Sequence, residues 1–329
     1  MVLEEFLAEW NNDKPTMLVH TSGSTGKPRP IWVEKARMLN SARITCDFLG
    51  LKPGDTALLC MPLDFIAGKM VVVRAIERQL KLISVKPCGH PMALAEPTTF
   101  AAMVPLQVYN SLQVPEEKVR LKAVRHLIIG GGAIDDDLAA ALRTFPNCVW
   151  STYGMTETLS HIALRRLNGE AASDWYTPFD SVRIDHDDDS CLMIDAPLVH
   201  KGILKTNDRV EIRVDEQTGI RQFRILGRKD NVIDSGGIKI QIEEVEQRLR
   251  PYLRAPFMIT KAPDRKFGEV VVLLYEGEYS EVYMKTLCKQ SLPAFWIPKR
   301  YIKIARLPMT GTGKPARSEA ERMAIISSC

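Results

Sequence analysis

The sequence predicts an α/β protein with a β-rich part and a small C-terminal α+β domain. Short apolar runs alternate with helical patterns over the first half of the chain, which is typical of a largely parallel sheet covered by helices. After residue 180 the pattern changes to short alternating runs, which favour antiparallel strands. A turn at 227–230 then precedes a further α/β unit, so we expect a large domain over 1–229 and a small domain over 230–329 joined by a hinge.

Composition and charge restrict the class of protein. The chain has 329 residues, of which 45% are hydrophobic and 26% charged, as in ordinary globular proteins. A net charge of +4 is too small to favour nucleic acid or an anionic membrane as a partner. We find no apolar run as long as a membrane span, and acidic residues stand where a signal peptide needs basic ones. Seven scattered cysteines favour reduced thiols, so we expect a cytoplasmic protein.

Periodicity predicts the elements of the first half in chain order. Helices are expected over residues 1–13, 33–49, 69–79, 101–112 and 135–144. Buried strands are expected over residues 17–19, 56–61, 81–85, 126–129 and 148–150. The acidic first turn of the helix at 135–144 suits the positive end of a helix dipole.

The second half is expected to contain shorter elements. Antiparallel strands are predicted over residues 181–184, 210–214 and 222–226. In the C-terminal unit, helices are predicted over 242–250 and 280–289, and strands over 257–261, 270–275 and 300–305.

A polar loop at residues 20–29, HTSGSTGKPR, follows the first predicted strand. Glycines let backbone N–H groups turn inward, hydroxyls add donors, and a lysine supplies charge, which together suit phosphate. A flexible polar turn is the alternative interpretation. A Walker A loop does not fit, because the glycines are too close and Pro28 stands where Ser or Thr is required. The candidate phosphate-binding residues are Thr21, Ser22, Gly23, Ser24, Thr25, Gly26 and Lys27.

This loop closely resembles the phosphate loop of the adenylate-forming superfamily, which includes acyl- and aryl-CoA ligases, peptide-synthetase adenylation domains and luciferases. Further stretches resemble the same superfamily in the same order and extend over nearly the whole chain. They are residues 130–133 (GGGA), 151–158 (STYGMTET), 206–208 (TND), 227–230 (GRKD), 235–240 (SGGIKI) and 307–317 (LPMTGTGKPAR). The resemblance implies binding of ATP, Mg²⁺ and coenzyme A, and a small-molecule carboxylic acid as substrate.

The resemblance implies roles for two of these stretches around the nucleotide. Gly131, Gly132 and Ala133 belong to a strand end beside the adenine and the acyl group, where glycine lets a flat ligand approach the backbone. Tyr153 is expected to stack on adenine and Thr156 to touch the α-phosphate. Glu157 is expected to hold magnesium, since Mg²⁺ takes one or two carboxylates together with phosphate oxygens.

The next two motifs are expected to bind ribose and to form the hinge. By resemblance, Asp208 accepts both ribose hydroxyls, as a carboxylate can, and Arg228 also contacts the ribose. Asn207 replaces the glycine of the superfamily's TGD motif. Asp230 is the expected pivot, since pivot residues absorb the φ/ψ change of a domain rotation.

The last two motifs imply a reaction in two steps. A substrate carboxylate attacks the α-phosphorus of ATP and expels pyrophosphate, with Lys314 bridging that carboxylate and the α-phosphate. The small domain then turns about Asp230 and withdraws Lys314. Gly236 and Gly237 line the tunnel through which the thiol of coenzyme A reaches the acyl-adenylate, giving a thioester and AMP.

Residues 62–76, PLDFIAGKMVVVRAI, most resemble o-succinylbenzoate–CoA ligases of menaquinone biosynthesis, particularly short bacterial ones. Only 19 residues precede residue 20, so part of the usual first subdomain is expected to be missing. Phe65 and Gly68 are expected to contact the acyl group. Arg74 is the candidate for the second carboxylate of a diacid, with an ion pair to Glu77 or a similar acid on or near its helix as the structural alternative and Lys69 as a second candidate.

Other functions remain open from the sequence. A fatty-acyl or other aryl-acid CoA ligase would have an apolar pocket without a cation, and a stand-alone adenylation domain would deliver to a carrier-protein thiol. An inactive nucleotide-binding protein is the alternative of another class, although such a protein has no need of Lys314. A homo-oligomer that covers an exposed sheet edge is a further expectation.

Overall fold

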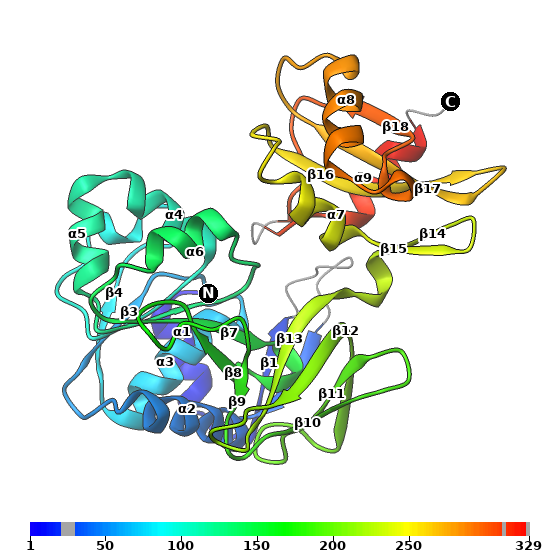
Figure 1. Cartoon of the computed structure of the whole chain (residues 1–329). Helices are drawn as coiled ribbons and strands as arrows, with labels where there is room; N and C mark the ends of the chain where they lie inside the picture. Colours follow the sequence, from blue (N-terminus) through cyan, green and yellow to red (C-terminus); the bar gives the residue numbers. More distant parts are fainter. Residues whose placement is uncertain (21–29, 311–313, 327–329) are drawn as a thin grey trace.

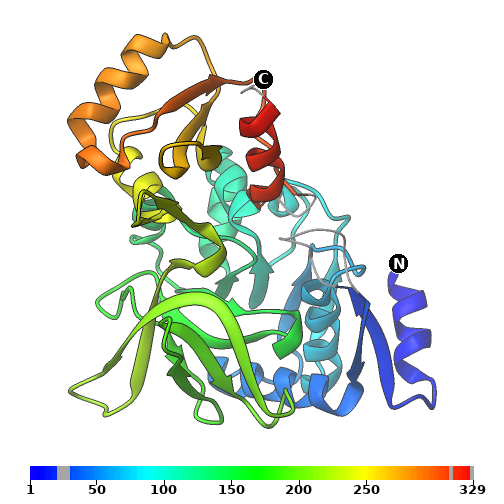
Figure 2. The ribbon, with the colours of Figure 1, turned by 90° about the vertical axis from the view of Figure 1, so that its right-hand side faces the viewer.

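The structure, a computed structural model, describes residues 1–20, 30–310 and 314–326. In Figure 1 a larger lower part carries the N-terminus and a smaller upper part carries the C-terminus. Figure 2 shows the same arrangement from the side, with β13 (Arg221–Arg228) running up towards the smaller part. Among the described residues, the helices are too short or too polar to span a lipid bilayer.

A seven-stranded sheet is the framework of the larger part. Its strand order is β4-β3-β5-β6-β7-β8-β9. The pairs from β4 to β7 are parallel, and β8 and β9 are added antiparallel. The bounds are β3 (Thr56–Leu59), β4 (Lys81–Ser84), β5 (Phe100–Met103), β6 (His126–Ile129), β7 (Cys148–Gly154), β8 (His161–Arg166) and β9 (Thr177–Pro178). The predicted α/β class with a largely parallel sheet is therefore confirmed.

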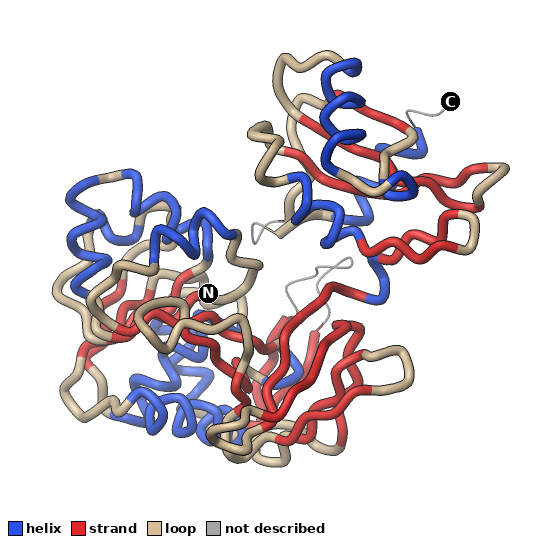
Figure 3. The backbone as a smooth tube through the Cα atoms, viewed as in Figure 1, coloured by secondary structure: helices blue, strands red, loops and turns tan. Residues whose placement is uncertain are grey.

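Helices cover this sheet, as Figure 3 shows with strands in red between helices in blue. Buried apolar side chains between Phe6 and Phe223 form one core cluster around it. A two-stranded antiparallel ribbon of β1 and β2 adjoins this core. The bounds are α1 (Leu3–Asn11), β1 (Thr16–His20), β2 (Pro30–Glu34), α2 (Lys35–Leu49), α3 (Ile66–Arg78), η1 (Pro91–Ala93), α4 (Pro105–Gln113), α5 (Pro115–Ala123), α6 (Asp136–Leu142) and η2 (Thr156–Thr158).

The helix predicted over 101–112 is wrong in its first part. Phe100–Met103 is the central strand β5, buried along its whole length between β3 and β6. The helix α4 begins only at Pro105, a residue suited to the first helical turn. A short apolar run has no periodicity that separates a buried strand from a helix, so only the neighbouring strands decide it. Helix α5 was not predicted, and β7 continues to Gly154 beyond its predicted end at residue 150.

The β-rich part is an antiparallel sheet, as predicted, and it has four strands. Its order is β10-β11-β12-β13. The strands are β10 (Arg183–His186), β11 (Cys191–Asp195), β12 (Ile203–Val214) and β13. An isolated bridge between Tyr176 and Phe223 connects this sheet to the segment that enters β9.

The C-terminal part is built on a five-stranded sheet. Strand order is β15-β14-β17-β16, and β18 pairs in parallel with β17. Two clusters of buried side chains between Ile233 and Ala324 form its cores. The hairpin β14–β15 and helix α9 were not predicted. The bounds are η3 (Lys229–Asn231), β14 (Val232–Ser235), β15 (Ile238–Gln241), α7 (Ile242–Leu249), β16 (Phe257–Asp264), β17 (Gly268–Tyr275), α8 (Glu281–Ser291), η4 (Ala294–Trp296), β18 (Arg300–Lys303) and α9 (Arg317–Ile326).

Candidate active site

A cavity of about 450 Å³ lies at the carboxyl ends of the parallel strands. Its wall includes residues at or just beyond the ends of β3, β5, β6 and β7, the first turns of α3, and Lys314 from the C-terminal part. Ligands of parallel α/β sheets bind at this edge, because the loops that follow the strands gather there. This cavity is therefore the candidate active site.

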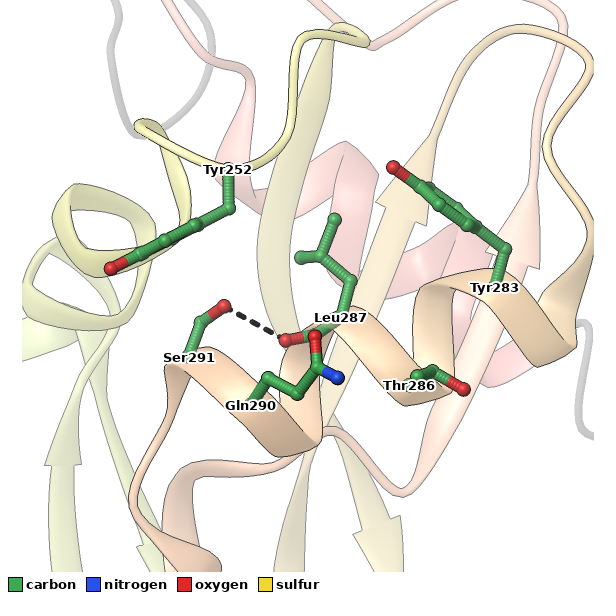
Figure 4. Close-up of a pocket in the computed structure, with 6 residues that line it drawn as sticks. All are labelled: Tyr252, Tyr283, Thr286, Leu287, Gln290 and Ser291. Carbon is green, nitrogen blue, oxygen red and sulfur yellow. Dashed lines mark hydrogen bonds between the residues drawn. The ribbon is translucent and has the colours of Figure 1, made fainter.

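A second, smaller cavity of about 220 Å³ lies in the C-terminal part. Figure 4 shows its six lining residues, with Tyr252 and Tyr283 on either side of Leu287 and a hydrogen bond from the Ser291 hydroxyl to the Leu287 carbonyl. The wall contains no carboxylate, lysine, arginine or histidine. A wall without charged side chains does not suit the phosphates and the carboxylate expected from the sequence, so the larger cavity stays the candidate active site.

Two glycines bring backbone close to the larger cavity. A Cβ atom on Gly130 would lie 2.2 Å from Oγ1 of Thr152 on the neighbouring strand, and one on Gly68 would lie 2.4 Å from the carbonyl oxygen of Pro62. Position 68 therefore requires glycine, because the clash is with backbone, whereas a side chain at 130 would require Thr152 to move. Gly68 and Phe65 line the cavity, as expected for acyl contacts.

Of the predicted glycine-rich strand end, Gly131 lines the cavity beside Gly130. Gly132 and Ala133 follow it but are not part of the wall. The phosphate-loop residues from Thr21 to Lys27 lie outside the described residues. His20, which immediately precedes them, lines the cavity and forms a β-bridge with Phe65, so the described chain leads to this site.

Lys314 reaches the cavity from the C-terminal part. Its backbone nitrogen donates to the Thr310 hydroxyl at 3.0 Å, and its carbonyl accepts from the Thr310 nitrogen at 2.7 Å. Burial and the nearby Arg228 lower the pKa of Lys314, while Asp208 opposes the shift. A partly desolvated ammonium group is thus presented to the cavity.

Asp208 links Tyr153, expected at the adenine, to Arg228, which is expected at the ribose together with Asp208. Its Oδ2 accepts a hydrogen bond from the hydroxyl of Tyr153 at 2.7 Å, and its Oδ1 accepts one from Nη1 of Arg228 at 3.0 Å. The Tyr153 ring is buried, with Phe223 edge-on at 5.0 Å, and it is not part of the cavity wall. Burial, followed by Asp208, raises the pKa of Tyr153, so the phenol is neutral and donates. Stacking of Tyr153 on adenine stays a prediction.

The expected pivot, Asp230, has two partners. Nη2 of Arg228 donates to it at 2.8 Å, and Nδ2 of Asn207 lies 3.0 and 3.1 Å from its two carboxylate oxygens. Gly236 and Gly237 form the turn of the β14–β15 hairpin, with φ of +64° and +83°. They do not line the cavity in this arrangement, so their expected role at the thiol tunnel stays a prediction.

Glu157 is the candidate magnesium ligand. Within the described ranges its half-buried carboxylate makes no ion pair or side-chain hydrogen bond, and only its backbone carbonyl is bonded, to His200. No group of three metal-binding side chains occurs in the part of the chain that the structure describes. A single carboxylate fits Mg²⁺, which completes its octahedron with phosphate and water oxygens. Thr156 beside it is buried and lines the cavity.

Arg74 is the largest fully buried side chain in the described residues and lines the cavity. The structural alternative of an ion pair with Glu77 is wrong, because Glu77 instead pairs with Arg43 and Arg78. Among the described residues Arg74 makes no ion pair with a carboxylate. Burial lowers its pKa to about 10, so it is still charged at neutral pH. An unpaired buried guanidinium requires an anion for full compensation.

Lys69, the second candidate for this anion, points elsewhere. It does not line the cavity. Its ammonium group lies 5.4 Å from the centre of the Phe6 ring and donates to the sulfur of Met1, both in the N-terminal segment. Its position on α3 therefore places it against α1.

Three residues of the hydrogen-bond network around Arg74 were missed from the sequence: Thr45, Ser160 and His161. The Arg74 guanidinium donates to the hydroxyls of Thr45 at 3.3 Å and Ser160 at 2.5 Å. His161 contacts both hydroxyls. No spacing rule could have found them, because Thr45 is 29 positions from Arg74 and 116 from His161.

Comparison with known proteins identifies related sequences. The AMP-binding enzyme family matches residues 4–190. The 2-succinylbenzoate–CoA ligase of Listeria monocytogenes is 22% identical, with 96% of this chain and 71% of that protein covered. The enzyme of the same name from Escherichia coli K12 is 27% identical, with 90% and 66% covered. The chain thus spans about two thirds of the length of these relatives.

Solved structures show the same fold. An AMP-forming acyl-CoA synthetase/AMP-acid ligase II-like protein from Dyadobacter fermentans is 31% identical, with 97% of this chain and 92% of that chain covered and a TM-score of 0.64. The o-succinylbenzoate coenzyme A synthetase of Bacillus subtilis, solved with ATP and a magnesium ion, is 24% identical, with 92% and 69% covered and a TM-score of 0.75.

Proposed function

Because the chain belongs to the family of AMP-binding enzymes, we propose that it is an AMP-forming acid–CoA ligase whose acid is a dicarboxylate, o-succinylbenzoate. Relatives named for this substrate cover most of the chain at 22–27% identity, which supports the proposal. The observation that carries it is the presence of two cations, Lys314 and Arg74, on the wall of one cavity.

The two cations suit the two ends of a diacid. Lys314 reaches the wall from the C-terminal part, whereas Arg74 belongs to α3 and bonds Thr45 and Ser160. One carboxylate is activated near Lys314 while the second pairs with Arg74. The wall as a whole is largely apolar, as an aromatic acid requires.

The residues at the Lys314 side have the chemistry for adenylation. The substrate carboxylate oxygen attacks the α-phosphorus, the new P–O bond forms, and pyrophosphate leaves. Negative charge on the phosphate oxygens is stabilised by Lys314 and by donors such as the Thr156 hydroxyl. Glu157 would hold Mg²⁺, which would supply further positive charge to the phosphates. The thiol of coenzyme A then replaces AMP at the acyl carbon.

The alternatives have weaker support. A fatty-acyl ligase would place an apolar chain against Arg74, which would leave a buried charge without compensation. A protein that only binds a nucleotide has no use for Lys314 in the cavity. No observation in the described residues favours a carrier-protein thiol over coenzyme A.

The test is pyrophosphate release by the purified protein with ATP, Mg²⁺ and o-succinylbenzoate, with and without CoA. Benzoate, succinate and a medium-chain fatty acid are the substrate controls. We expect pyrophosphate release and a CoA-dependent thioester with o-succinylbenzoate but with none of the three control acids. Release with the fatty acid instead would keep the chemistry and reject the substrate. No release with any acid, from protein that still binds ATP, would reject the enzymatic proposal.

The Arg74→Gln variant tests the assignment of the second carboxylate. We expect KM for o-succinylbenzoate to rise at least tenfold, while KM for ATP stays within about twofold, because a charge-assisted bond to a carboxylate is worth about 1.5–3 kcal/mol. Arg120→Gln, a change of an arginine outside the cavity wall, is the matched control. An unchanged KM for the acid in folded Arg74→Gln would reject the role of Arg74.

A further inference from the structure

Four polar side chains from three elements form a closed ring of hydrogen bonds at the cavity wall. Nη2 of Arg74 on α3 lies 3.3 Å from Oγ1 of Thr45 on α2 and 2.5 Å from Oγ of Ser160. The His161 ring at the start of β8 completes the ring, with Nε2 3.1 Å from Thr45 and Nδ1 3.2 Å from Ser160. Arg74, Ser160 and His161 all line the cavity.

The donors available determine where the protons lie. Arg74 can only donate, so both hydroxyl oxygens accept from it. The Thr45 hydroxyl donates its own proton to the Ser41 carbonyl at 3.1 Å, so its oxygen also accepts from His161 Nε2–H. Nδ1 of His161 is then the acceptor for the Ser160 hydroxyl. Every hydroxyl and ring nitrogen in the ring thus has a defined donor or acceptor role.

The imidazole in this ring is neutral. His161 is buried, and burial followed by the charge of Arg74 lowers its pKa well below the ordinary value of 6.5. The ring therefore holds one positive charge, on Arg74, and one imidazole tautomer, with the proton on Nε2.

We infer that Thr45 and His161 are positioning residues for Arg74 that determine selectivity for a dicarboxylic acid over a monocarboxylic one. The inference rests on the proposed function. Both hydrogens of Nη2 are bonded within the ring, whereas Nη1 and the buried Nε make no hydrogen bond in the described part of the chain. Nη1 and Nε are thus the nitrogens left for the second carboxylate. A guanidinium already fixed in place loses little freedom when that carboxylate binds.

A merely structural role for the ring predicts a different result. Loss of a packing contact lowers stability and affects all acids alike. Loss of positioning affects only the acid that uses Arg74, and it does so in KM rather than in kcat, because the second carboxylate is remote from the reacting atoms. The ratio of kcat/KM values for diacid and monoacid separates the two roles.

The test compares Thr45→Val with Thr45→Ser. Valine is close to threonine in size but lacks the hydroxyl, whereas serine retains it. The substrates are o-succinylbenzoate and its two monoacid analogues, 4-oxo-4-phenylbutanoate and 2-propanoylbenzoate, each of which lacks one carboxyl group. For Thr45→Val we expect KM for the diacid to rise about tenfold, or about 1.4 kcal/mol, with kcat within about twofold. Thr45→Ser and the monoacid reactions should change less than about twofold.

A second pair of variants tests the histidine and guards against a folding defect at residue 45. Glutamine at 161 keeps a donor and an acceptor, and leucine has neither. We expect His161→Leu to raise KM for the diacid about tenfold and His161→Gln to recover most of the wild-type value. Thermal melting with and without ATP establishes that each variant is folded.

The outcomes distinguish the inference from the proposed function. Wild-type protein that prefers the diacid, together with Thr45→Val and His161→Leu variants that keep this preference, would overturn the inference alone. Wild-type protein that uses either monoacid as well as the diacid would overturn the proposed substrate and the inference with it. Equal losses on all three acids in the variants would assign Thr45 and His161 to structure only.

Discussion

Nδ2 of Asn207 lies within 3.1 Å of both carboxylate oxygens of Asp230, and this contact joins strand β12 to the turn that leads into the C-terminal part. Arg228 bonds the same carboxylate and also Asp208. The residue that replaces glycine in the expected ribose motif therefore bonds the expected pivot. Lys314 lines the cavity in this arrangement, so we propose that the contact stabilises the arrangement used in the first of the two proposed half-reactions.

Replacement of Asn207 by alanine should weaken the first half-reaction. A bond between an amide and a charged carboxylate at the surface is worth about 0.5–1.5 kcal/mol, so we expect adenylate formation to fall about 2- to 10-fold in single-turnover experiments. Thioester formation from supplied acyl-adenylate should stay within about twofold or increase. Asn207→Asp should be worse, because it places a like charge beside Asp230. Equal losses in both half-reactions would contradict a role at the pivot.

Lys314→Ala should separate the two half-reactions more sharply. We expect adenylate formation to fall about 10²- to 10³-fold, in the range found for loss of one group that stabilises developing charge. Thioester formation from supplied acyl-adenylate should be spared, because Lys314 is expected to leave the site before that step. Lys289→Ala, on α8, is the control. Similar losses of both steps in folded protein would refute the assigned role.

Breaking the ion pair of Arg317 with Glu246 should destabilise the C-terminal part. Nη1 and Nη2 of Arg317 lie 2.6 and 2.7 Å from Oε1 and Oε2 of Glu246. Oε1 also accepts a hydrogen bond from the backbone nitrogen of Ile259 at 2.9 Å. Both side chains are largely buried. Arg317→Met alone should therefore lower the free energy of unfolding by about 3–5 kcal/mol, since it leaves a buried carboxylate unpaired.

The double variant Arg317→Met with Glu246→Leu checks the cause of that loss. Removal of both charges avoids an unpaired buried ion, so it should cost less than either single change. Urea unfolding of the four proteins in the cycle measures this coupling. Additive losses would show that the ion pair contributes no coupling.

His161 should make stability depend on pH on the acid side. Its pKa is lowered in the folded protein, first by burial and then by Arg74, so the unfolded chain takes up its proton at a higher pH. The contribution of the neutral histidine is fully present above about pH 6.5 and is lost as the pH falls below that value. Between pH 6.5 and 5 we expect wild type to lose up to about 2 kcal/mol more than His161→Gln, since one pKa unit is worth 1.36 kcal/mol.

Urea unfolding at several pH values between 5 and 8 measures this difference. The exposed His186, replaced by glutamine, is the control. Identical pH profiles for wild type and His161→Gln would contradict the lowered pKa of His161.

Much of the fold was predictable because its signals are local. Strand β6 has its predicted bounds. Helix α2 was predictable because an apolar face at helical spacing persists over four turns, and it begins two residues after the predicted start. Strand β5 was predicted as helix, because Phe100–Met103 is apolar throughout and has no period of its own. At the β14–β15 hairpin the sequence predicts a loop, because strands of four residues carry too short a pattern and only their pairing identifies them.

The candidate site was likewise predictable only in part. Motifs with unusual composition identified the family and pointed to Lys314, Glu157, Asp208 and Arg228, because their chemistry requires particular residues at fixed spacings. The sequence also selected Arg74, but two interpretations of it stayed open. Only the structure showed that Glu77 pairs with other arginines and that Arg74 lies in the cavity without a carboxylate.

The sequence by itself therefore determined the fold class and the family and supplied the candidate residues of a nucleotide site, since short-range patterns and motif spacing are written along the chain. The tertiary structure alone decided which distant side chains meet. It joined Thr45, Arg74 and His161 into one ring and Asn207 to Asp230. Such contacts depend on how helices pack on the sheet and how the two parts lie together, and long-range packing leaves no periodic trace in the order of residues.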